Sequence, residues 1–276
     1  MSQTLTAFLS EGPAILVEIE AVKGSSPREA GTFMLVSATR IWETIGGGQF
    51  EYMAIDHARA MLDGRTEIDV LDIPLGPEIG QCCGGRTLLR FTKVTEAVAV
   101  ALSKRMQDAE DQQPAVFVFG AGHVGKALAN SLSLLPVSVS VIETRREELV
   151  GLPGTVLTHL TPMPEAMVKD IPAGGAAIIV THDHALDFLI AKEALGRGDL
   201  AYVGMIGSKT KRATFANWLA REGHVGTLDN LVLPIGGTLV KDKRPAIIAA
   251  LVTSEVLHAI QRFAALAQVQ SGSALR

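Results

Sequence analysis

The sequence predicts an α/β protein in which a Rossmann-like parallel-sheet domain follows a smaller N-terminal α+β domain. From residue 114 onward, short apolar runs alternate with amphipathic helical segments, a pattern typical of a parallel sheet covered on both faces. The first of these runs, residues 115–119, leads into the turn GAGHVG at 120–125 and then into a helix. A G-x-G-x-x-G pattern indicates a phosphate-binding turn only when it follows a strand and begins a helix, as it does here.

The N-terminal domain is expected to span residues 1–103 and to mix strands and helices in irregular order. An apolar stripe predicts a helix over 49–62. His57 lies on that stripe, where a histidine is more often a packed core residue than a ligand. Residues 104–113 are polar and lack an apolar period, which predicts an interdomain linker. The other predicted elements are strands at 14–22, 32–36, 40–45, 67–71 and 86–92, and helices at 3–10 and 94–104.

The Rossmann-like domain is expected to span residues 114–276. Its strands are predicted from apolar runs and its helices from apolar residues that recur at helical spacing. The predicted strands are 115–119, 137–142, 155–157, 176–180, 201–206 and 231–233, and the predicted helices are 124–134, 165–169, 186–195, 209–221 and 245–265.

Each glycine of the turn at 120–125 has a predicted role. Gly120 permits the tight turn, Gly122 lets a ligand phosphate approach the backbone, and Gly125 lets the helix pack close to the strand. The new helix directs free N–H groups and a partial positive charge at the ligand. His123, inside the turn, is expected to contact the ligand.

Glu143 ends the second predicted strand of this domain, eighteen residues after Gly125. An acidic residue near this position holds a ribose hydroxyl in dinucleotide-binding domains. Arg145 and Arg146 follow it and offer an alternative contact to phosphate. The segment is otherwise read as a solvated loop that leads into a helix.

Two further clusters follow buried strands, where ligands bind in open α/β sheets. The first is Thr181-His182-Asp183-His184 with Asp187, which is expected to line the cleft. A metal site is an alternative, but Asp183 also suits the cap of a helix. The second cluster, residues 207–212, begins with a glycine and continues with Ser208, Lys209, Lys211 and Arg212. It is either an anion site at a helix start or an ordinary capped, solvated helix.

Two glycine-rich stretches mark the N-terminal domain. Cys82 and Cys83 lie in the segment GQCCGG, after Gln81. Adjacent cysteines rarely pair with each other, and no second cysteine pair completes a zinc site. The open alternatives are a thiolate nucleophile, a sulfur carrier and a ligand to a soft metal. The second stretch, residues 46–48, is a glycine triplet that is either a flexible connector or a loop that exposes main chain to a ligand.

Composition argues against a nucleic-acid-binding, membrane-spanning or secreted protein. The chain has 276 residues and a net charge of −4, which does not favour nucleic-acid binding. Residues 1–103 carry 8 Lys/Arg and 13 Asp/Glu, whereas residues 104–276 carry 17 and 16, so a phosphate is expected on the second domain. No membrane span and no signal peptide are expected, because residues 247–260 contain charged Glu255 and the first residues lack a basic, apolar leader. Only two cysteines, next to each other, fit a reducing cytoplasm.

Taken together, several motifs resemble the XdhC/CoxI family of accessory proteins for xanthine dehydrogenase and related molybdenum hydroxylases. The motifs are GSSPR at 24–28, IGGG at 45–48, GQCCGG at 80–85, GAGHVG at 120–125, THDH at 181–184 with Asp187, and GMIGSK at 204–209. Relatives often have Asp where this chain has Glu143.

The resemblance implies a cofactor chaperone of purine catabolism rather than an enzyme. It would bind molybdenum cofactor, protect it while its terminal sulfur is installed, and insert it into the dehydrogenase. The implied partners are the molybdenum-binding subunit of xanthine dehydrogenase and a cysteine desulfurase-type sulfurtransferase, and a homodimer is implied.

These expectations place the cofactor phosphate at residues 120–125 or 208–212. The molybdenum end would face Cys82 or Cys83 across the domain interface, since a thiolate suits a soft centre. Cofactor contacts are also expected from Gln81, Glu143, Arg145, His182 and Asp183. One alternative is an NAD(P)-dependent oxidoreductase with His123 or His182 as proton donor. Another is an interaction protein that recruits a sulfurtransferase and binds no small molecule.

Overall fold

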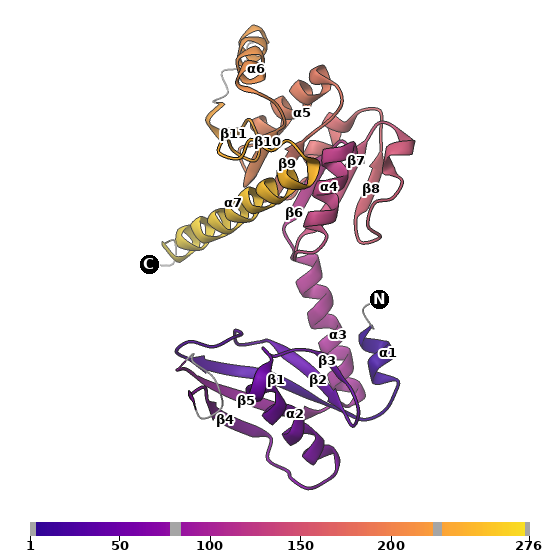
Figure 1. Cartoon of the computed structure of the whole chain (residues 1–276), viewed down its shortest axis with the longest axis vertical. Coiled ribbons are helices and arrows are strands. Elements are labelled where there is room, and N and C mark those ends of the chain that lie inside the picture. The colour runs from indigo at the N-terminus through magenta and orange to yellow at the C-terminus, as the bar shows by residue number, and fades with distance from the viewer. Residues whose placement is uncertain (1–3, 78–83, 223–227, 274–276) are drawn as a thin grey trace. The chain divides into compact units, whose positions relative to one another are not determined.

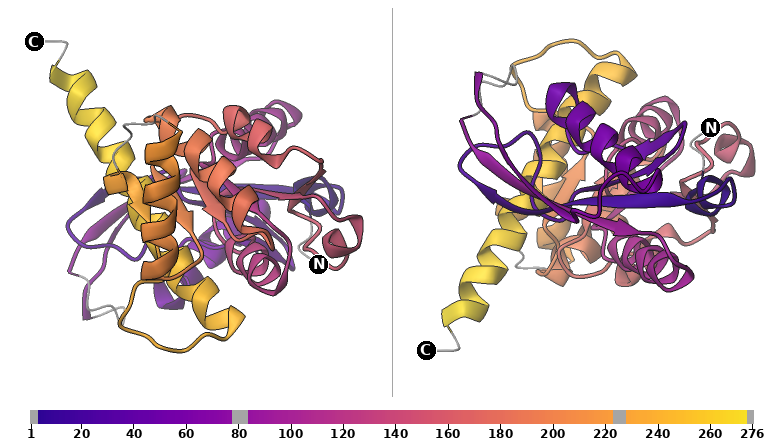
Figure 2. Two further views of the ribbon diagram at one scale, coloured as in Figure 1. Left: turned by 90° about the horizontal axis from the view of Figure 1, so that it is seen from above. Right: turned by 90° about the horizontal axis from the view of Figure 1, so that it is seen from below.

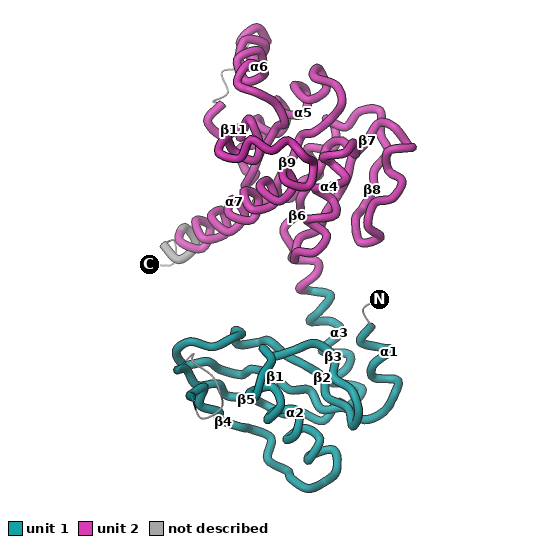
Figure 3. Tube along the Cα trace, viewed as in Figure 1, with its two compact units in different colours: residues 1–108 teal, residues 109–276 magenta. Residues whose placement is uncertain are grey.

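The computed structural model describes residues 4–77, 84–222 and 228–273. The chain divides into two compact units, Met1–Asp108 and Ala109–Arg276 (Figure 3). The first is an α+β unit and the second an α/β unit with a parallel sheet, so the predicted fold class is confirmed.

The N-terminal unit is built on a five-stranded antiparallel sheet of order β3-β2-β1-β5-β4. Alternate residues of β1 point to opposite faces: Ile15 and Val17 pack with α2, and Leu16 packs with α1 and α3. The elements are α1 (Leu5–Leu9), β1 (Ala14–Lys23), β2 (Phe33–Ser37), β3 (Ile41–Glu43), α2 (Gly48–Leu62), β4 (Val70–Pro74), β5 (Arg86–Lys93) and α3 (Glu96–Asp111).

The segment expected to be an irregular linker is mostly helical. Helix α3 continues to Asp111 and carries the chain across the boundary between the units. Leu102 is buried against the N-terminal sheet, but the last turns bury nothing. The polar composition therefore marks an exposed helix rather than an irregular segment.

The C-terminal unit holds a six-stranded parallel sheet of order β11-β10-β9-β6-β7-β8 (Figure 1). In order of appearance its strands are arranged 6-5-4-1-2-3, the doubly wound order of dinucleotide-binding folds. The elements are β6 (Ala115–Phe119), α4 (His123–Leu132), β7 (Ser138–Glu143), η2 (Arg146–Leu149), β8 (Leu157–Leu160), η3 (Pro164–Asp170), β9 (Ala176–Ile179), α5 (His184–Arg197), β10 (Tyr202–Met205), α6 (Lys209–Arg221), η4 (Leu228–Asn230), β11 (Leu231–Val232) and α7 (Pro245–Ser273).

Helices cover both faces of this sheet (Figure 1, Figure 2). Val116 and Val118 of β6 pack toward α4 and α7, whereas Phe117 and Phe119 pack toward α5, α6 and η3. The strands are therefore apolar on both sides, which explains their uninterrupted hydrophobic runs.

Helix α7 is longer than expected. Over Pro245–Val269 it is long and apolar enough to cross a membrane, so the sequence-based exclusion of such a segment was wrong as to length and composition. One face of the helix nevertheless packs on the sheet and α4 through Ala249, Val252, Val256 and Ile260.

Candidate functional site

The carboxyl ends of the parallel strands bring most of the predicted site residues to one edge of the C-terminal unit. β6 and β9 are neighbours in the sheet, and the chain leaves them toward opposite sides. In open α/β sheets the ligand crevice lies at such a switch point. The turn after β6 and the loop after β9 both meet there: Gly120, Glu143, Thr181 and His182 line one small crevice.

The glycine turn has the tight geometry that the fingerprint predicts. Gly120 has φ of +108°, and a Cβ there would lie 2.6 Å from the Val180 carbonyl oxygen. A Cβ on Gly125 would lie 1.9 Å from the Gly120 carbonyl oxygen. Both positions therefore exclude any side chain.

Gly122 differs from the other two glycines. It is the N-cap of α4 with φ of −66°, and a Cβ there would meet nothing within 4 Å. No side chain caps the helix, and His123 is exposed at its first position. The start of α4 thus offers open backbone to an anion, as phosphate binding requires.

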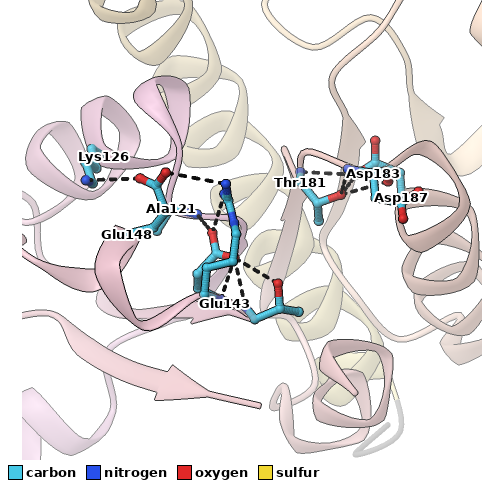
Figure 4. Close-up of polar contacts among 9 residues, drawn as sticks. Ala121, Lys126, Glu143, Glu148, Thr181, Asp183 and Asp187 are labelled. Carbon is cyan, nitrogen blue, oxygen red and sulfur yellow. Dashed lines mark hydrogen bonds and ion pairs between the residues drawn. The ribbon is translucent and has the colours of Figure 1, made fainter. Parts of the chain in front are cut away.

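Glu143 is buried beneath this turn, and its side chain is only 2% exposed. Its Oε2 accepts a hydrogen bond from Ala121 N at 2.8 Å, and its Oε1 accepts from Thr144 N at 2.8 Å (Figure 4). Arg145 donates two further hydrogen bonds to Glu143, from Nε and Nη2, each at 3.3 Å. The carboxylate was predicted to hold a ribose, yet its oxygens are bonded to the turn and to the loop that follows it.

These bonds determine the acidity of the group. Burial raises the pKa of the Glu143 carboxyl, but hydrogen bonds from Arg145, Ala121 and Thr144 outweigh it and lower the pKa from 4.5 to about 2. The ionised form therefore stabilises the fold.

We expect Glu143 to contribute pH-dependent stability that Glu143→Gln abolishes. Because the folded pKa is the lower one, the contribution of about 3 kcal/mol is complete above pH 4.5 and is lost as the pH falls toward 2. Urea denaturation of both proteins from pH 6 to pH 2.5 measures the difference in unfolding free energy. A difference that stays constant over this range would contradict the assignment.

A surface ion-pair network borders the turn. Lys126 Nζ lies 3.2 Å from the Glu148 carboxylate, and Arg145 Nη1 lies 3.4 Å from the same carboxylate (Figure 4). Arg145, a predicted phosphate contact, is thus shared between Glu143 and Glu148, although a third of its side chain remains exposed.

Asp187 organises the loop after β9. Its side chain is 1% exposed and accepts hydrogen bonds from Thr181 N at 3.1 Å and from Thr181 Oγ1 at 2.7 Å (Figure 4). The ammonium of Lys211, also buried, pairs with Asp187 and donates to the Ile206 carbonyl oxygen at 2.9 Å. The loops after β9 and β10 are thereby tied together.

Asp183 caps α5 through a bond from Ala185 N at 2.8 Å, which confirms the capping alternative. His182 and His184 are exposed. Within the described ranges, no three His, Cys, Asp or Glu side chains are grouped to hold a metal ion. The described side chains at THDH therefore form no such group, and Asp183 serves as a helix cap.

The predicted cation cluster at the start of α6 is mostly engaged elsewhere. Ser208 caps the helix by accepting from Lys211 N at 3.3 Å. Lys211 is paired with Asp187, and Arg212 donates to the Leu228 and Leu231 carbonyl oxygens. Lys209 is the cation of this cluster that remains exposed.

In the N-terminal unit, three loops singled out from the sequence converge. Ser25 forms a bridge with Gly84, and a Cβ on Gly46 would lie 3.1 Å from Pro27. Glu51, buried on α2, accepts from Ile45 N at 3.0 Å and Gly47 N at 3.1 Å, which orders the glycine triplet. The triplet is thus a defined loop in this structure.

Gln81, Cys82 and Cys83 lie outside the described residues, so their predicted roles stay predictions. His57 has a packing role: its Nε2 lies 2.8 Å from the Ile68 carbonyl oxygen, and its ring meets Phe91 edge-on.

Sequence reasoning missed a groove of about 670 Å³ beside the start of α4. It lies between Val124, the loop after β10 and the loop after β11, and its apolar floor comes from Ile206, Ile235, Ile248 and Leu251. The pattern LPIGG at 233–237, which follows a short strand, was the available signal.

A partly buried polar contact holds the wall of the groove. Glu255 Oε2 on α7 accepts from Tyr202 OH at 2.8 Å and from Gly236 N at 3.1 Å. Burial and the charge of Glu255 raise the pKa of Tyr202 well above its usual range, so the hydroxyl stays a donor.

Comparisons with known proteins agree with this fold. Residues 116–256 match the family model described as the XdhC Rossmann domain, and residues 8–73 match that of the XdhC and CoxI family. The uncharacterized protein YqeB of Escherichia coli is 27% identical over 265 residues, which are 89% of this chain and 43% of that protein. The chain therefore spans less than half of this curated relative.

A solved structure from Bacillus halodurans, described as a xanthine dehydrogenase, superposes with a TM-score of 0.76 at 16% identity. The match covers 93% of this chain and 94% of that one. At this identity the likeness concerns the fold alone.

Proposed function

Because the chain belongs to the XdhC and CoxI family, we propose that it binds molybdenum cofactor and inserts it into a xanthine dehydrogenase. Family membership supports an accessory role associated with xanthine dehydrogenase. The finer proposal is a chaperone that protects the cofactor while its terminal sulfur is installed. It would act in the cytoplasm, as a homodimer, on the molybdenum-binding subunit of its client and with a cysteine desulfurase-type sulfurtransferase.

The observation that carries the proposal is the contrast between Gly122 and Glu143. The start of α4 is open to a phosphate at Gly122, whereas the carboxylate that would hold a ribose is already saturated. This combination favours a ligand with a phosphate and no ribose diol to bind. Molybdenum cofactor, a pterin with a dithiolene-bound metal and a phosphate, has this chemistry.

The chemistry of the predicted residues suits each end of the cofactor. The glycine turn would hold the phosphate. His123 is exposed within this turn, and Ser208 and Lys209 are exposed after β10, at the same edge of the sheet. Cys82 or Cys83 would hold the soft, sulfur-rich metal end, because thiolates bind such centres well. When bound, the cofactor would be cargo, and the chain would shield it from solvent.

Removing the thiols tests the metal contact. Cys82→Ala and Cys83→Ala are each titrated with molybdenum cofactor and with metal-free molybdopterin. We expect at least one variant to bind the cofactor about tenfold more weakly, a loss of about 1.4 kcal/mol, with unchanged affinity for metal-free molybdopterin. Wild-type affinity for both ligands in both variants would refute the cysteine role.

An NAD(P)-dependent oxidoreductase is the second candidate, favoured by the glycine turn and the doubly wound strand order. The engaged Glu143 speaks against it. Calorimetry with NAD and NADP separates the two functions: binding of either dinucleotide without binding of molybdenum cofactor would replace the chaperone proposal.

A further inference from the structure

The groove beside α4 adjoins the glycine turn. Val124 contributes to its wall, and Val124 directly follows His123 and Gly122 in the first turn of α4. A ligand whose phosphate lies at Gly122 therefore has the groove within immediate reach. Its volume of about 670 Å³ is within the range of small-molecule sites, roughly 300–1,000 Å³.

The lining combines an apolar floor with exposed main chain and a cationic rim. Gly207, Gly236 and Gly237 leave backbone groups without side chains along the wall. Lys241 and Lys243 also line the groove. Asp242 is paired with Arg244 at 2.6 Å, so the acidic side chain between the two lysines is already neutralised.

The groove is held in shape by the contact of Glu255 with Tyr202 and Gly236. Gly204 makes room for Tyr202, since a Cβ there would lie 2.4 Å from the tyrosine ring. A partly buried side chain from α7 and a buried one from β10 thus fix the position of the Gly236–Gly237 turn. Such preorganisation lowers the cost of binding.

From these features we infer that the groove binds the ring of a phosphorylated planar heterocycle, with the phosphate at Gly122. The apolar floor contacts the ring face, the backbone of Gly207 and Gly237 pairs with the ring edge, and the lysine rim attracts the anionic arm. In the cofactor-chaperone proposal, on which this assignment rests for its ligand, the ring is the pterin. Glu255 is a positioning residue that acts through Gly236.

Filling the groove tests the inference. Thr238 lines it, whereas the next residue, Leu239, does not line it and is 97% exposed. In calorimetric titrations with metal-free molybdopterin and with 6-hydroxymethylpterin, we expect Thr238→Trp to weaken both by at least tenfold. Leu239→Trp, the matched control, should bind both within twofold of wild type.

A second variant tests the rim without filling the groove. Lys241→Glu combined with Lys243→Glu should weaken molybdopterin at least tenfold while the melting temperature stays within a few degrees of wild type. If both groove variants bind like wild type, the groove assignment is wrong while the chaperone proposal stands. If wild type instead binds 6-hydroxymethylpterin in the groove but rejects molybdenum cofactor, the chaperone proposal fails and the groove assignment survives.

Discussion

Gly125→Ala is expected to destabilise the C-terminal unit by more than about 3 kcal/mol. The added methyl group would lie 1.9 Å from the Gly120 carbonyl oxygen, a backbone atom that is itself fixed between β6 and Val180. Relief of this overlap requires α4 to move away from the sheet and to lose packing of Leu128 and Leu132. Overpacking that displaces backbone is among the most costly effects of a single substitution.

Gly122→Ala is the matched control for this prediction. It adds the same methyl group in the same turn, but into open space and at a φ that alanine adopts. We expect a stability change of about 1 kcal/mol or less, since alanine is a poorer N-cap than glycine. We expect Gly122→Ala instead to weaken the binding of phosphate-bearing ligands, because the added methyl group would occupy the space beside Gly122 that a phosphate needs.

Tryptophan fluorescence during urea denaturation measures the unfolding free energy of both variants. The chain has two tryptophans, Trp42 in the N-terminal unit and Trp218 in the C-terminal one, so a Trp42→Phe background reports on the unit that contains the turn. If Gly125→Ala were no less stable than Gly122→Ala in this background, the close packing of α4 on the turn would be refuted.

Asp187→Asn is expected to cost about 3–5 kcal/mol of unfolding free energy. The amide still accepts from Thr181, but it leaves the buried ammonium of Lys211 without its counter-charge. Removing one partner of a buried ion pair costs far more than the pair itself contributes. Adding Lys211→Met should restore much of the loss, because the double variant buries no unpaired charge.

Asp183→Asn is the control for this second prediction. It makes the same chemical change four residues earlier, at an exposed N-cap where asparagine is an equally good cap. We expect its unfolding free energy to stay within about 0.5 kcal/mol of wild type. Equal costs for Asp183→Asn and Asp187→Asn in urea denaturation would show that the buried pair does not stabilise the fold.

Much of the fold could be predicted because its signals are local. The five apolar residues of β6 and the helix α6 at Lys209–Arg221 match the predicted bounds. The glycine turn was also predictable, since its steric demands concern residues only a few positions apart. Helix α3 could not be bounded in this way: its last turns are polar because they are exposed, and polarity by itself does not separate an exposed helix from a loop.

The candidate site was less predictable than the fold. Lys211 and Arg212 looked like free cations at a helix start, but one pairs with Asp187 and the other with backbone carbonyls. The groove and the contact of Glu255 with Tyr202 join residues more than fifty positions apart. No local pattern encodes such a pairing.

The amino-acid sequence alone thus determines the two-part α/β organisation, the family and the glycine turn, because periodicity and backbone sterics are properties of neighbouring residues. The tertiary structure decided which charged side chains are paired within the protein and which backbone groups stay accessible to a ligand. Hydrogen bonds from Ala121 and Arg145 engage the Glu143 carboxylate, so that it stabilises the glycine turn. Gly122 remains accessible. The physical reason is that the strand order brings loops that are distant in sequence to one edge of the sheet. Buried polar groups there must form hydrogen bonds or ion pairs, and the partners come from whichever loops lie beside them.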